Sequence, residues 1–459
     1  MRIAARRATH FVSRHVANGL RVSIPERVRC LTKSRFLRNV TVVAGGTAIA
    51  QIVTFVFWPL ITRLYGPEAF GILGVFLALL TTVAPLSSLT YNLAIVLPSS
   101  DGEARAIIKL SFLISLLITS LSALAIAGFH REIADAIGFR TASELLLLVP
   151  IMIPLSTTVE VLRHWMIRKK QFIAISRIAV AEALVGGTSK LVVGSIAATA
   201  PVLLVLNVLA RAFYAVLMWL SARRTLSCRH DPMSAGAEIL DDASLRGVAR
   251  RYGDFPFFRA PQVWLNEASN AAPALLLAAL VGPAAAGFYT VATRALALPS
   301  AVVAGAVGTV FLPRAAEAHH RSETLRPLIL QGTAGLALVG LLPFGLVVGF
   351  GPWLFGLVFG PEWVTAGHYA QWLAIMLFFK FINVPSVQAI PILGLQGKLL
   401  VYEITIVTLR FASLAVGVLL LKSDVAAIAF FSISSAAAYV WLIIWVVVSS
   451  GKHSNRGRG

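Results

Sequence analysis

The chain has 459 residues, of which 58% are hydrophobic and only 13% are charged, and its mean hydropathy is +0.81. An ordinary soluble domain has roughly 45–50% apolar and about 25% charged residues. This composition argues against a soluble enzyme, a soluble nucleic-acid-binding protein and a disordered scaffold, and it predicts a membrane protein. The net charge of +20 is then explained by basic loops on one side of a membrane, with no nucleic-acid partner.

Long apolar runs divide the chain into about twelve segments, each close to the ~20 residues that an α-helix needs to cross a bilayer. The apolar pattern is helical or uniform, and the alternation typical of an outer-membrane barrel is absent from it. We therefore predict an all-α polytopic membrane protein with two six-helix lobes. The N-lobe spans are expected at 41–63, 72–97, 108–129, 145–166, 176–198 and 201–221. The C-lobe spans are expected at 256–281, 286–312, 328–350, 368–394, 399–420 and 425–449.

Basic residues set the expected topology. Alternate loops hold nearly all the Arg and Lys outside the apolar runs, and the opposite set holds only Arg63, Arg131, Arg140 and Lys422. The positive-inside rule then places both termini in the cytoplasm. The predicted divisions are a basic N-terminal arm, the N-lobe, a cytoplasmic inter-lobe loop, the C-lobe and a basic tail: 1–38, 39–221, 222–253, 254–449 and 450–459.

A short motif occurs at equivalent places in the two halves. Gly66-Pro67 is followed by Gly71 between spans one and two, and Gly282-Pro283 is followed by Gly287 between spans seven and eight. A single Gly-Pro pair is a common turn signal. Two copies at the same place in two six-helix halves predict lobes of equal orientation, related by an axis along the membrane normal.

Five short segments occur in an order that is typical of one family of membrane proteins. They are Pro59–Gly71, Tyr91–Glu103, Arg168–Phe172, Gly282–Arg294 and Val358–Trp363. In this order they resemble the Wzx-type oligosaccharide flippases, which are polysaccharide transporters of the multidrug/oligosaccharidyl-lipid/polysaccharide exporter superfamily. The resemblance covers about residues 38–450, and it depends on the order of the motifs more than on any one of them.

The resemblance implies two six-helix lobes around a cavity that opens alternately to each side. It also implies a flippase that moves a polyprenyl-diphosphate-linked oligosaccharide to the outer leaflet of the bacterial inner membrane. The product would serve exopolysaccharide, capsule or lipopolysaccharide O-antigen synthesis. The implied partners are this substrate and membrane lipid; a polysaccharide polymerase, glycosyltransferases and a coupling H⁺ or Na⁺ are left open.

Charged residues inside the spans give a physical test of this resemblance, because they are costly in lipid and usually face a bundle interior or a wet cavity. Such a surplus of positive charge suits a diphosphate, since Arg and Lys replace its hydration. Glu267 is the main deep acid, and it is interpreted as a counter-ion, an H⁺ or Na⁺ site, or the partner of an arginine. Glu182 is expected nearer the cytoplasmic end of its span. The cations expected to line a substrate cavity are Arg211, Arg294, Lys380 and Arg410 at depth, with Arg63 at the outer rim.

Several polar and aromatic residues of the spans also fit purely structural roles. Arg63 and Lys190 lie near span ends, where pairing with an acid or extension to the headgroups accounts for them equally well. Tyr91 and Asn92 could hydrogen-bond a sugar, although an interfacial tyrosine is a common lipid anchor. Trp363 is expected in an aromatic belt at the membrane surface.

Two alternative functions are also compatible with this composition. One is a multidrug and toxin extrusion antiporter, which a cationic cavity disfavours because its cargoes are usually cations. The other is a membrane-embedded polysaccharide polymerase or glycosyltransferase, which the short external loops disfavour. The sequence has no Walker-type loop, no His-Glu-x-x-His spacing and no Gly-x-Ser-x-Gly motif. We therefore expect no catalytic residue, no metal and no cofactor.

Overall fold

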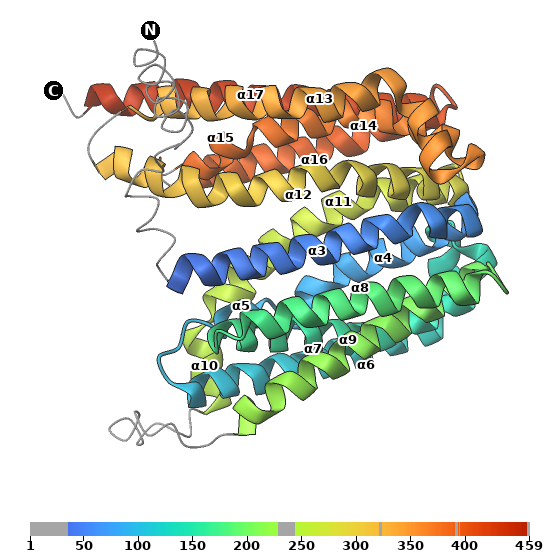
Figure 1. Ribbon diagram of the computed structural model, residues 1–459, viewed down its shortest axis with the longest axis horizontal. Coiled ribbons are helices and arrows are strands. Elements are labelled where there is room, and N and C mark those ends of the chain that lie inside the picture. The colour runs from blue at the N-terminus through green and yellow to red at the C-terminus, as the bar shows by residue number, and fades with distance from the viewer. Residues whose placement is uncertain (1–34, 228–243, 321–323, 391–392, 394, 457–459) are drawn as a thin grey trace, which may run out of the picture.

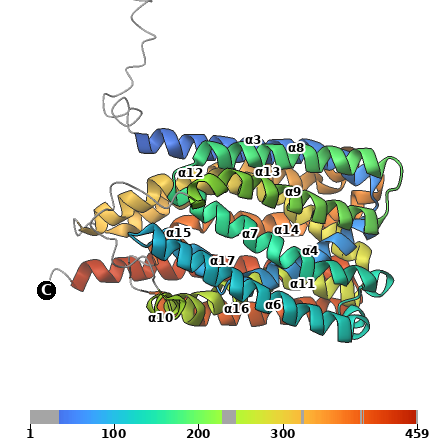
Figure 2. The ribbon, with the colours of Figure 1, turned by 90° about the horizontal axis from the view of Figure 1, so that it is seen from below.

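The computed structural model describes residues 35–227, 244–320, 324–390, 393 and 395–456 (Figure 1). Within these residues every regular element is helical, and the long helices run side by side in both views (Figures 1 and 2). The all-α fold class is therefore confirmed. The predicted basic arm 1–38 lies almost wholly outside the described residues, as does the middle of the predicted inter-lobe loop.

The N-terminal group of helices follows most of the predicted spans closely. Its long members are α3 (Arg35–Leu64), α4 (Pro67–Ser87), α6 (Asp101–Ala136), α7 (Leu148–Arg168), α8 (Phe172–Gly194) and α9 (Ala200–Ser227). Two short elements join them, α5 (Tyr91–Ala94) and η1 (Arg140–Leu147). The start of α6 is set locally, because the Ser100 hydroxyl accepts a hydrogen bond from the Glu103 N–H at 3.2 Å.

The C-terminal group has the same succession of long helices. They are α11 (Ala260–Leu280), α12 (Pro283–His320), α13 (Leu325–Phe359), α14 (Val364–Ile382), α16 (Gln396–Leu419) and α17 (Asp424–Arg456). Shorter elements are α10 (Leu245–Arg251), η4 (Phe255–Arg259), η5 (Pro361–Trp363) and α15 (Val384–Ala389). The predicted span 368–394 is divided between α14 and α15, because Pro385 cannot continue the helical hydrogen bonding of α14.

Nine of the helices in the described residues are long and apolar enough to cross a membrane. The expected spans formed by α3, α11 and α12 are not among the nine. Parts of α3 and α12 have side chains outside the description, and α11 carries Asn266, Glu267 and Asn270. A polytopic membrane protein is confirmed, whereas the number of twelve spans and the two symmetric lobes stay predictions.

The helices pack in two groups that meet along a seam. In the N-terminal group α3 packs on α8, and α7 packs on α4, α6 and α9; in the C-terminal group α14 packs on α12, α13 and α17. Between the groups, α4 contacts α11 and α12, and α3 contacts α13. Figure 1 shows α3 and α4 lying between the remainder of the N-terminal group and the C-terminal group.

The two copies of the Gly-Pro motif contact each other across this seam. A Cβ atom added to Gly71 would overlap the carbonyl group of Pro283, and a Cβ atom added to Gly287 would overlap the carbonyl of Pro67. Pro67 and Pro283 each start a helix, where a fixed φ and a missing N–H are tolerated. The contact is thus reciprocal between equivalent motif positions. We call this end of the bundle the Gly-Pro end, and the opposite end, where α3 begins and α17 ends, the terminal end.

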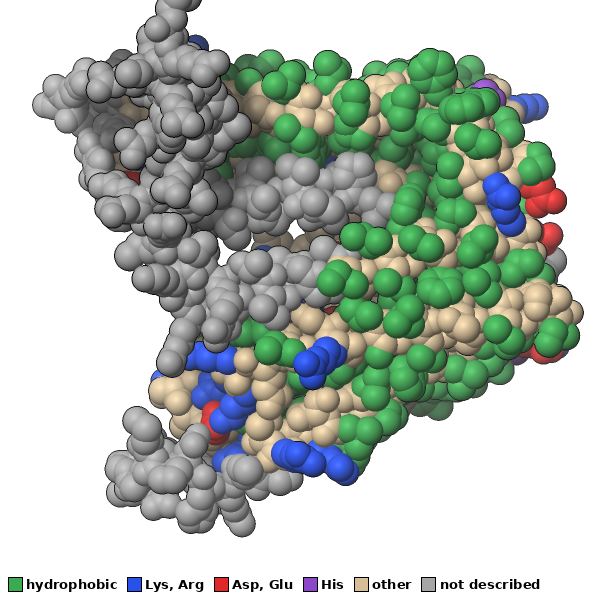
Figure 3. Space-filling view, viewed as in Figure 1, with side chains coloured by type: hydrophobic (Ala, Val, Ile, Leu, Met, Phe, Trp, Pro, Cys, Tyr) green, Lys and Arg blue, Asp and Glu red, His purple; other side chains and the backbone are tan. Residues whose placement is uncertain are grey.

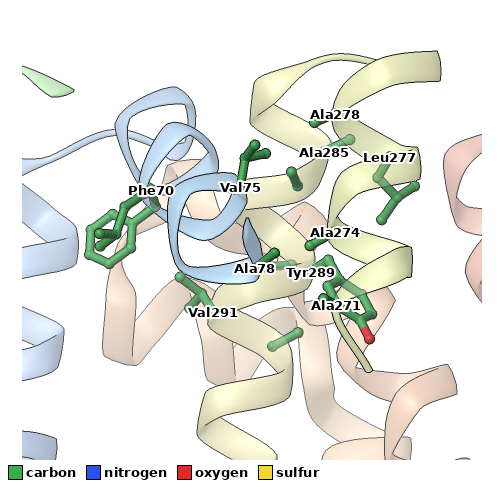
Figure 4. Close-up of a cluster of buried hydrophobic side chains, with 14 of the residues drawn as sticks. Phe70, Val75, Ala78, Ala271, Ala274, Leu277, Ala278, Ala285, Tyr289 and Val291 are labelled. Atoms are coloured by element: carbon green, nitrogen blue, oxygen red, sulfur yellow. The ribbon is translucent and has the colours of Figure 1, made fainter. Parts of the chain in front are cut away.

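Small side chains continue this close contact along the seam. Figure 4 shows alanines of α11 and α12 near α4, with Val75 on the side of α4 that meets them and Phe70 on the other side, where its ring packs against Trp363. Ala274, Ala278 and Ala285 are all buried. Small residues allow helix backbones to approach closely in membranes, where van der Waals contact replaces the hydrophobic effect as the source of stability.

The surface is typical of a protein surrounded by lipid. Large apolar side chains such as Leu124, Ile196 and Leu342 are 72%, 85% and 81% exposed. Hydrophobic side chains cover most of the visible face toward the Gly-Pro end, and Lys and Arg gather at the terminal end of the N-terminal group (Figure 3). So large an apolar surface would cause aggregation in water, and it is stable only in a membrane.

Candidate functional site

A cavity lies between the two helix groups and consists of two adjoining chambers. One has a volume of about 500 Å³ and the other about 630 Å³, and both are lined by Glu182 and Asn207. The walls come from α3, α4, α7, α8 and α9 of the N-terminal group and from α11 and α12 of the C-terminal group. We name them the cation chamber, which contains Lys190 and Arg294, and the hydroxyl chamber, which contains Arg211 and Glu267.

The cation chamber brings two positive side chains from different groups together. Lys190 of α8 donates a hydrogen bond from Nζ to Asn207 Oδ1 at 3.1 Å, and it lies within electrostatic range of Arg294 of α12. Arg294 has an accessible side chain and makes no hydrogen bond or ion pair with any described residue. A guanidinium at this depth needs water or a ligand to satisfy its five N–H groups. Arg294 is therefore free to bind an anion.

The hydroxyl chamber combines neutral polar, charged and apolar side chains. Eight of its lining residues carry a hydroxyl or an amide: Thr81, Ser87, Ser88, Thr90, Asn92, Ser156, Thr157 and Asn207. The Thr157 hydroxyl is hydrogen-bonded to Ser87 and Ser115 at 2.9 and 3.0 Å, which fixes α7 against α4 and α6. Groups that both donate and accept hydrogen bonds suit sugar hydroxyls, which do the same.

Charge in the combined cavity is nearly balanced. Its lining cations are Arg163, Lys190, Arg211 and Arg294, and its lining acids are Glu160, Glu182 and Glu267. Glu160 and Arg163 pair with each other at 2.6 Å. Glu182 lies within electrostatic range of Lys190 and Arg211. The positive surplus is one charge, smaller than the sequence suggested, and it is concentrated where Lys190 and Arg294 meet.

Three of the six predicted site residues line this cavity, namely Arg211, Glu267 and Arg294. Arg211 lies over the Tyr214 ring at 5.9 Å, and its Nε has no hydrogen-bond partner among the described residues. Glu267 accepts a long contact of 3.5 Å from Asn266 Nδ2. The cavity is therefore lined by one predicted arginine from each helix group, Arg211 and Arg294, and by the predicted deep acid, Glu267.

Two of the other predicted residues lie within the C-terminal group. Arg410 is held between α16 and α17, where it donates to Ser435 Oγ at 3.0 Å and to the Tyr439 hydroxyl at 2.6 Å. Lys380 is exposed near the end of α14. Neither residue lines the cation chamber or the hydroxyl chamber. A role of these two residues in a substrate cavity stays a prediction, since Arg410 is held against α17 and Lys380 is exposed.

Arg63 acts at the Gly-Pro end of the bundle. Its Nη2 donates to the Leu357 carbonyl at 2.6 Å, in the last turn of α13. Beside it, buried Trp363 donates from Nε1 to the Thr62 carbonyl at 3.1 Å. The Trp363 ring packs edge-on against Phe70 of α4 and Phe288 of α12, with centroids 5.4 and 6.1 Å apart. These contacts join both helix groups beyond the cavity and close this end.

Several cavity residues are not singled out by the sequence. Lys190 fits an end-of-span role equally well, but α8 places it on the face that meets Asn207 of α9. Glu182 is expected near the cytoplasmic end of its span, yet it lines both chambers. Tyr91, by contrast, does not line either chamber, because it is buried and donates a hydrogen bond to the Ala249 carbonyl of α10. Of the predicted sugar-binding pair, its neighbour Asn92 alone lines the cavity.

Comparison with known proteins identifies the family. A family model described as polysaccharide biosynthesis protein matches residues 60–237 and 260–368, which is more than half of the chain. The chain belongs to this family. The matched segments include Arg211, Glu267 and Arg294, whereas Lys380 and Arg410 lie beyond them.

One curated relative and two solved structures extend this result. The succinoglycan biosynthesis transport protein ExoT of Rhizobium meliloti (strain 1021) is 25% identical over 372 residues, which are 79% of this chain and 70% of ExoT. An inward-facing multidrug resistance MATE family transporter of the MOP superfamily superposes with a TM-score of 0.66 at 13% identity, covering 88% of this chain and 96% of that one. The inward closed form of the lipid II flippase MurJ gives 0.63 at 13% identity, covering 90% and 89%. At this identity the structures show a shared fold.

Proposed function

We propose that this protein is a flippase that moves a polyprenyl-diphosphate-linked oligosaccharide from the cytoplasmic to the outer leaflet of the bacterial inner membrane. Membership of the polysaccharide biosynthesis protein family supports this function. The relative named a succinoglycan transport protein and the fold shared with a lipid II flippase support the same direction. The product would enter cell-surface polysaccharide synthesis, with polymerase and glycosyltransferases acting on either side of the step.

The observation that carries the proposal is Arg294, which pairs with no described residue and lies beside a chamber with eight hydroxyl- or amide-bearing lining residues. The headgroup of the proposed substrate also has two parts, an anionic diphosphate and an uncharged glycan. Arg294 and Lys190 would bind the diphosphate through charge-assisted hydrogen bonds. The hydroxyl chamber, with Arg211 at its wall, would then receive the sugar.

The proposed orientation places the Gly-Pro end outside the cell. Basic residues of the described loops gather at the terminal end, as expected for the cytoplasmic side. Outward movement of an anion from a negative cytoplasm is favoured by about 2.3 kcal/mol per charge per 100 mV. The membrane potential would therefore assist export, with or without a coupling H⁺ or Na⁺ at Glu267.

Thiol labelling tests this orientation. A cysteine at Ala284, in the turn at the Gly-Pro end, is expected to react with a membrane-impermeant reagent added to intact cells. A cysteine at Ser244, which caps the start of α10 at the terminal end, is expected to react only after the cells are opened. The reverse pattern would contradict the proposed orientation.

Polymer export tests the function itself. In cells that lack their own copy of the gene, Arg294→Ala is expected to lower export at least about tenfold, because a charged hydrogen bond contributes about 1.5–3 kcal/mol. Arg294→Lys keeps the charge and should retain part of the export. Arg131→Ala is the matched control, since Arg131 is an exposed arginine outside the cavity. Full export by the alanine variant at equal expression would remove Arg294 from the substrate site.

A multidrug antiporter is the second function that a specific observation favours. Three acids line the cavity, and the fold is also that of a MATE transporter. This function predicts that the chain confers resistance to cationic drugs and that Glu267→Gln abolishes this resistance. The flippase proposal predicts no such resistance.

A further inference from the structure

A second charged pocket lies at the terminal end of the N-terminal group, away from the substrate cavity. It has a volume of about 670 Å³ and lies between the start of α8 and the end of α9. Four of its lining residues are cations: Lys170, Arg177, Arg223 and Arg224. No Asp or Glu occurs among the described residues that line it. We call it the α8–α9 pocket.

None of the four cations forms an ion pair with a described acid. The neighbouring basic residues Arg168 and Lys169 both pair with Asp101, so the local acid is already occupied. By contrast, Lys170, Arg177 and Arg224 have no ion pair or hydrogen bond with any described residue. Arg223 makes one weak contact, with its guanidinium 5.7 Å from the centre of the Trp219 ring. The pocket is therefore a concentration of uncompensated positive charge.

Local backbone geometry directs these cations to one place. Lys170 has a φ of +57°, which ends α7 in a sharp turn, and α8 starts two residues later at Phe172. The first turn of α8 lines the pocket through Phe172, Ile173 and Ala174. The positive end of the α8 dipole thus adds to the charge of the side chains.

An exposed apolar surface begins directly beside the cations. Ile173 and Leu220 line the pocket and are 56% and 39% exposed. Farther along α9, Val216, Leu209 and Val205 are also exposed and recur at helical spacing on the same face. The opposite face of α9 lines the substrate cavity through Leu203, Asn207 and Arg211. The pocket and this stripe are therefore separate from the transport site.

We infer that the α8–α9 pocket binds the headgroup of an anionic phospholipid, with the acyl chains lying along the exposed stripe of α9. A soluble anion would use the cations and leave the apolar stripe unexplained. A zwitterionic lipid would use the stripe and leave four cations uncompensated. An anionic lipid satisfies both, as expected for basic pockets between helices at the cytoplasmic membrane surface. This site does not depend on the identity of the transported substrate.

Lipid binding to the purified full-length protein tests the site. Phosphatidylglycerol bound to the protein in detergent is counted by native mass spectrometry over a range of lipid concentrations. The double variant Arg223→Gln/Arg224→Gln is expected to weaken binding of the first lipid at least about tenfold, because it removes two cations that attract the anionic headgroup. The double variant Arg246→Gln/Arg250→Gln is the matched control, because it removes two exposed arginines of α10 at the same end of the protein. It should change binding less than about twofold.

Further variants and competing ligands distinguish lipid binding from anion binding and from loss of folding. Arg223→Lys/Arg224→Lys should retain most of the binding, because it keeps both charges, and an unchanged thermal midpoint of the glutamine variant in detergent shows that this variant is folded. Leu220→Gln should weaken phosphatidylglycerol binding, and phosphatidylethanolamine should not compete with it. Inorganic phosphate at the same concentration should not displace the lipid. Equal losses in the α10 control, or displacement by phosphate alone, would overturn the inference.

Discussion

The two halves of the seam between the helix groups differ in kind, although the same helices form both. Toward the Gly-Pro end, α4 presents Phe70, Gly71 and Gly74 to the C-terminal group, and backbones touch. Toward the terminal end, the same α4 lines the hydroxyl chamber from Leu77 to Ser87. Phe70 and Leu73 also line the cation chamber, so the closest contact is confined to the face of α4 that carries Gly71 and Gly74.

Helix α12 changes from seam contact to cavity wall over a single turn. Thr290 fills the space beside Gly74 in the seam, whereas Arg294, four residues later, lies in the cavity. Glycine and alanine close one part of the interface and charged or hydroxyl side chains hold the other part open. In this conformation the seam is therefore closed by backbone contact at the Gly-Pro end and hollow farther along. An alternating-access mechanism requires the closed part of the seam to separate. Substitutions at the glycine contacts therefore test this requirement.

The largest expected effect comes from the reciprocal glycines. Gly71→Ala and Gly287→Ala each place a methyl group on a backbone carbonyl, which cannot move aside as a side chain can. Overpacking of this kind costs about 1–3 kcal/mol. We expect a lower thermal midpoint in detergent. A cysteine at Thr54, which lines the cation chamber, should also become reactive from the Gly-Pro end.

The matched control for these variants is Gly345→Ala. Gly345 lies within α13, and nothing would contact its added methyl group. Alanine is a better helix former than glycine by about 1 kcal/mol. This variant should therefore keep or raise the thermal midpoint. A similar loss in all three variants would mean that the seam has no special role.

A smaller effect is expected from the aromatic contacts that close the Gly-Pro end. Trp363→Phe keeps an aromatic ring against Phe70 and Phe288 but leaves the buried Thr62 carbonyl without its donor. The expected loss is about 1–2 kcal/mol of unfolding free energy. Arg63→Gln removes an exposed hydrogen bond and should cost less than about 1 kcal/mol. Equal losses, measured by denaturation in the same detergent, would contradict the distinction between buried and exposed contacts.

The smallest effect concerns charge in the open half. Glu182 lies within electrostatic range of Lys190 and Arg211, so it weakens the field that an anion meets. Glu182→Gln should strengthen binding of a diphosphate-containing lipid by a factor of about two to five, about 0.4–1 kcal/mol. Fluorescence titration with a labelled substrate analogue measures this change. Weaker binding would mean that Glu182 holds Lys190 in its binding position.

Much of the fold could be predicted, because apolar run length and helical pattern determine where helices lie. The position of a charged residue along its predicted span could also be predicted. Three of the residues chosen for lying deep within a span line the cavity: Arg211, Glu267 and Arg294. The side of a helix that faces the cavity was harder to predict. In uniformly apolar helices no polar face marks the inside, so the sequence could not separate Arg294 from Arg410, which bonds to Tyr439 within its own group.

Contacts between groups could not be predicted at all from one chain. The Gly-Pro repeats are recognisable as equivalent, but their mutual contact depends on how the two helix groups meet. Trp363 was expected at the membrane surface, and that expectation was wrong, because the residue is 1% exposed and packs between α4 and α12. A tryptophan near a span end gives the same sequence signal in both situations.

The most direct test of the central claim is transport by the purified protein in sealed vesicles. A fluorescent polyprenyl-diphosphate oligosaccharide is placed in both leaflets, and the fraction that reaches the outer face is measured with a membrane-impermeant quencher. We expect that the wild-type protein and Arg131→Ala bring the inner-leaflet lipid to the quencher rapidly and that Arg294→Ala does so at least about tenfold more slowly. Equal rates for wild-type and Arg294→Ala proteins, or no movement by the wild type, would contradict the central claim.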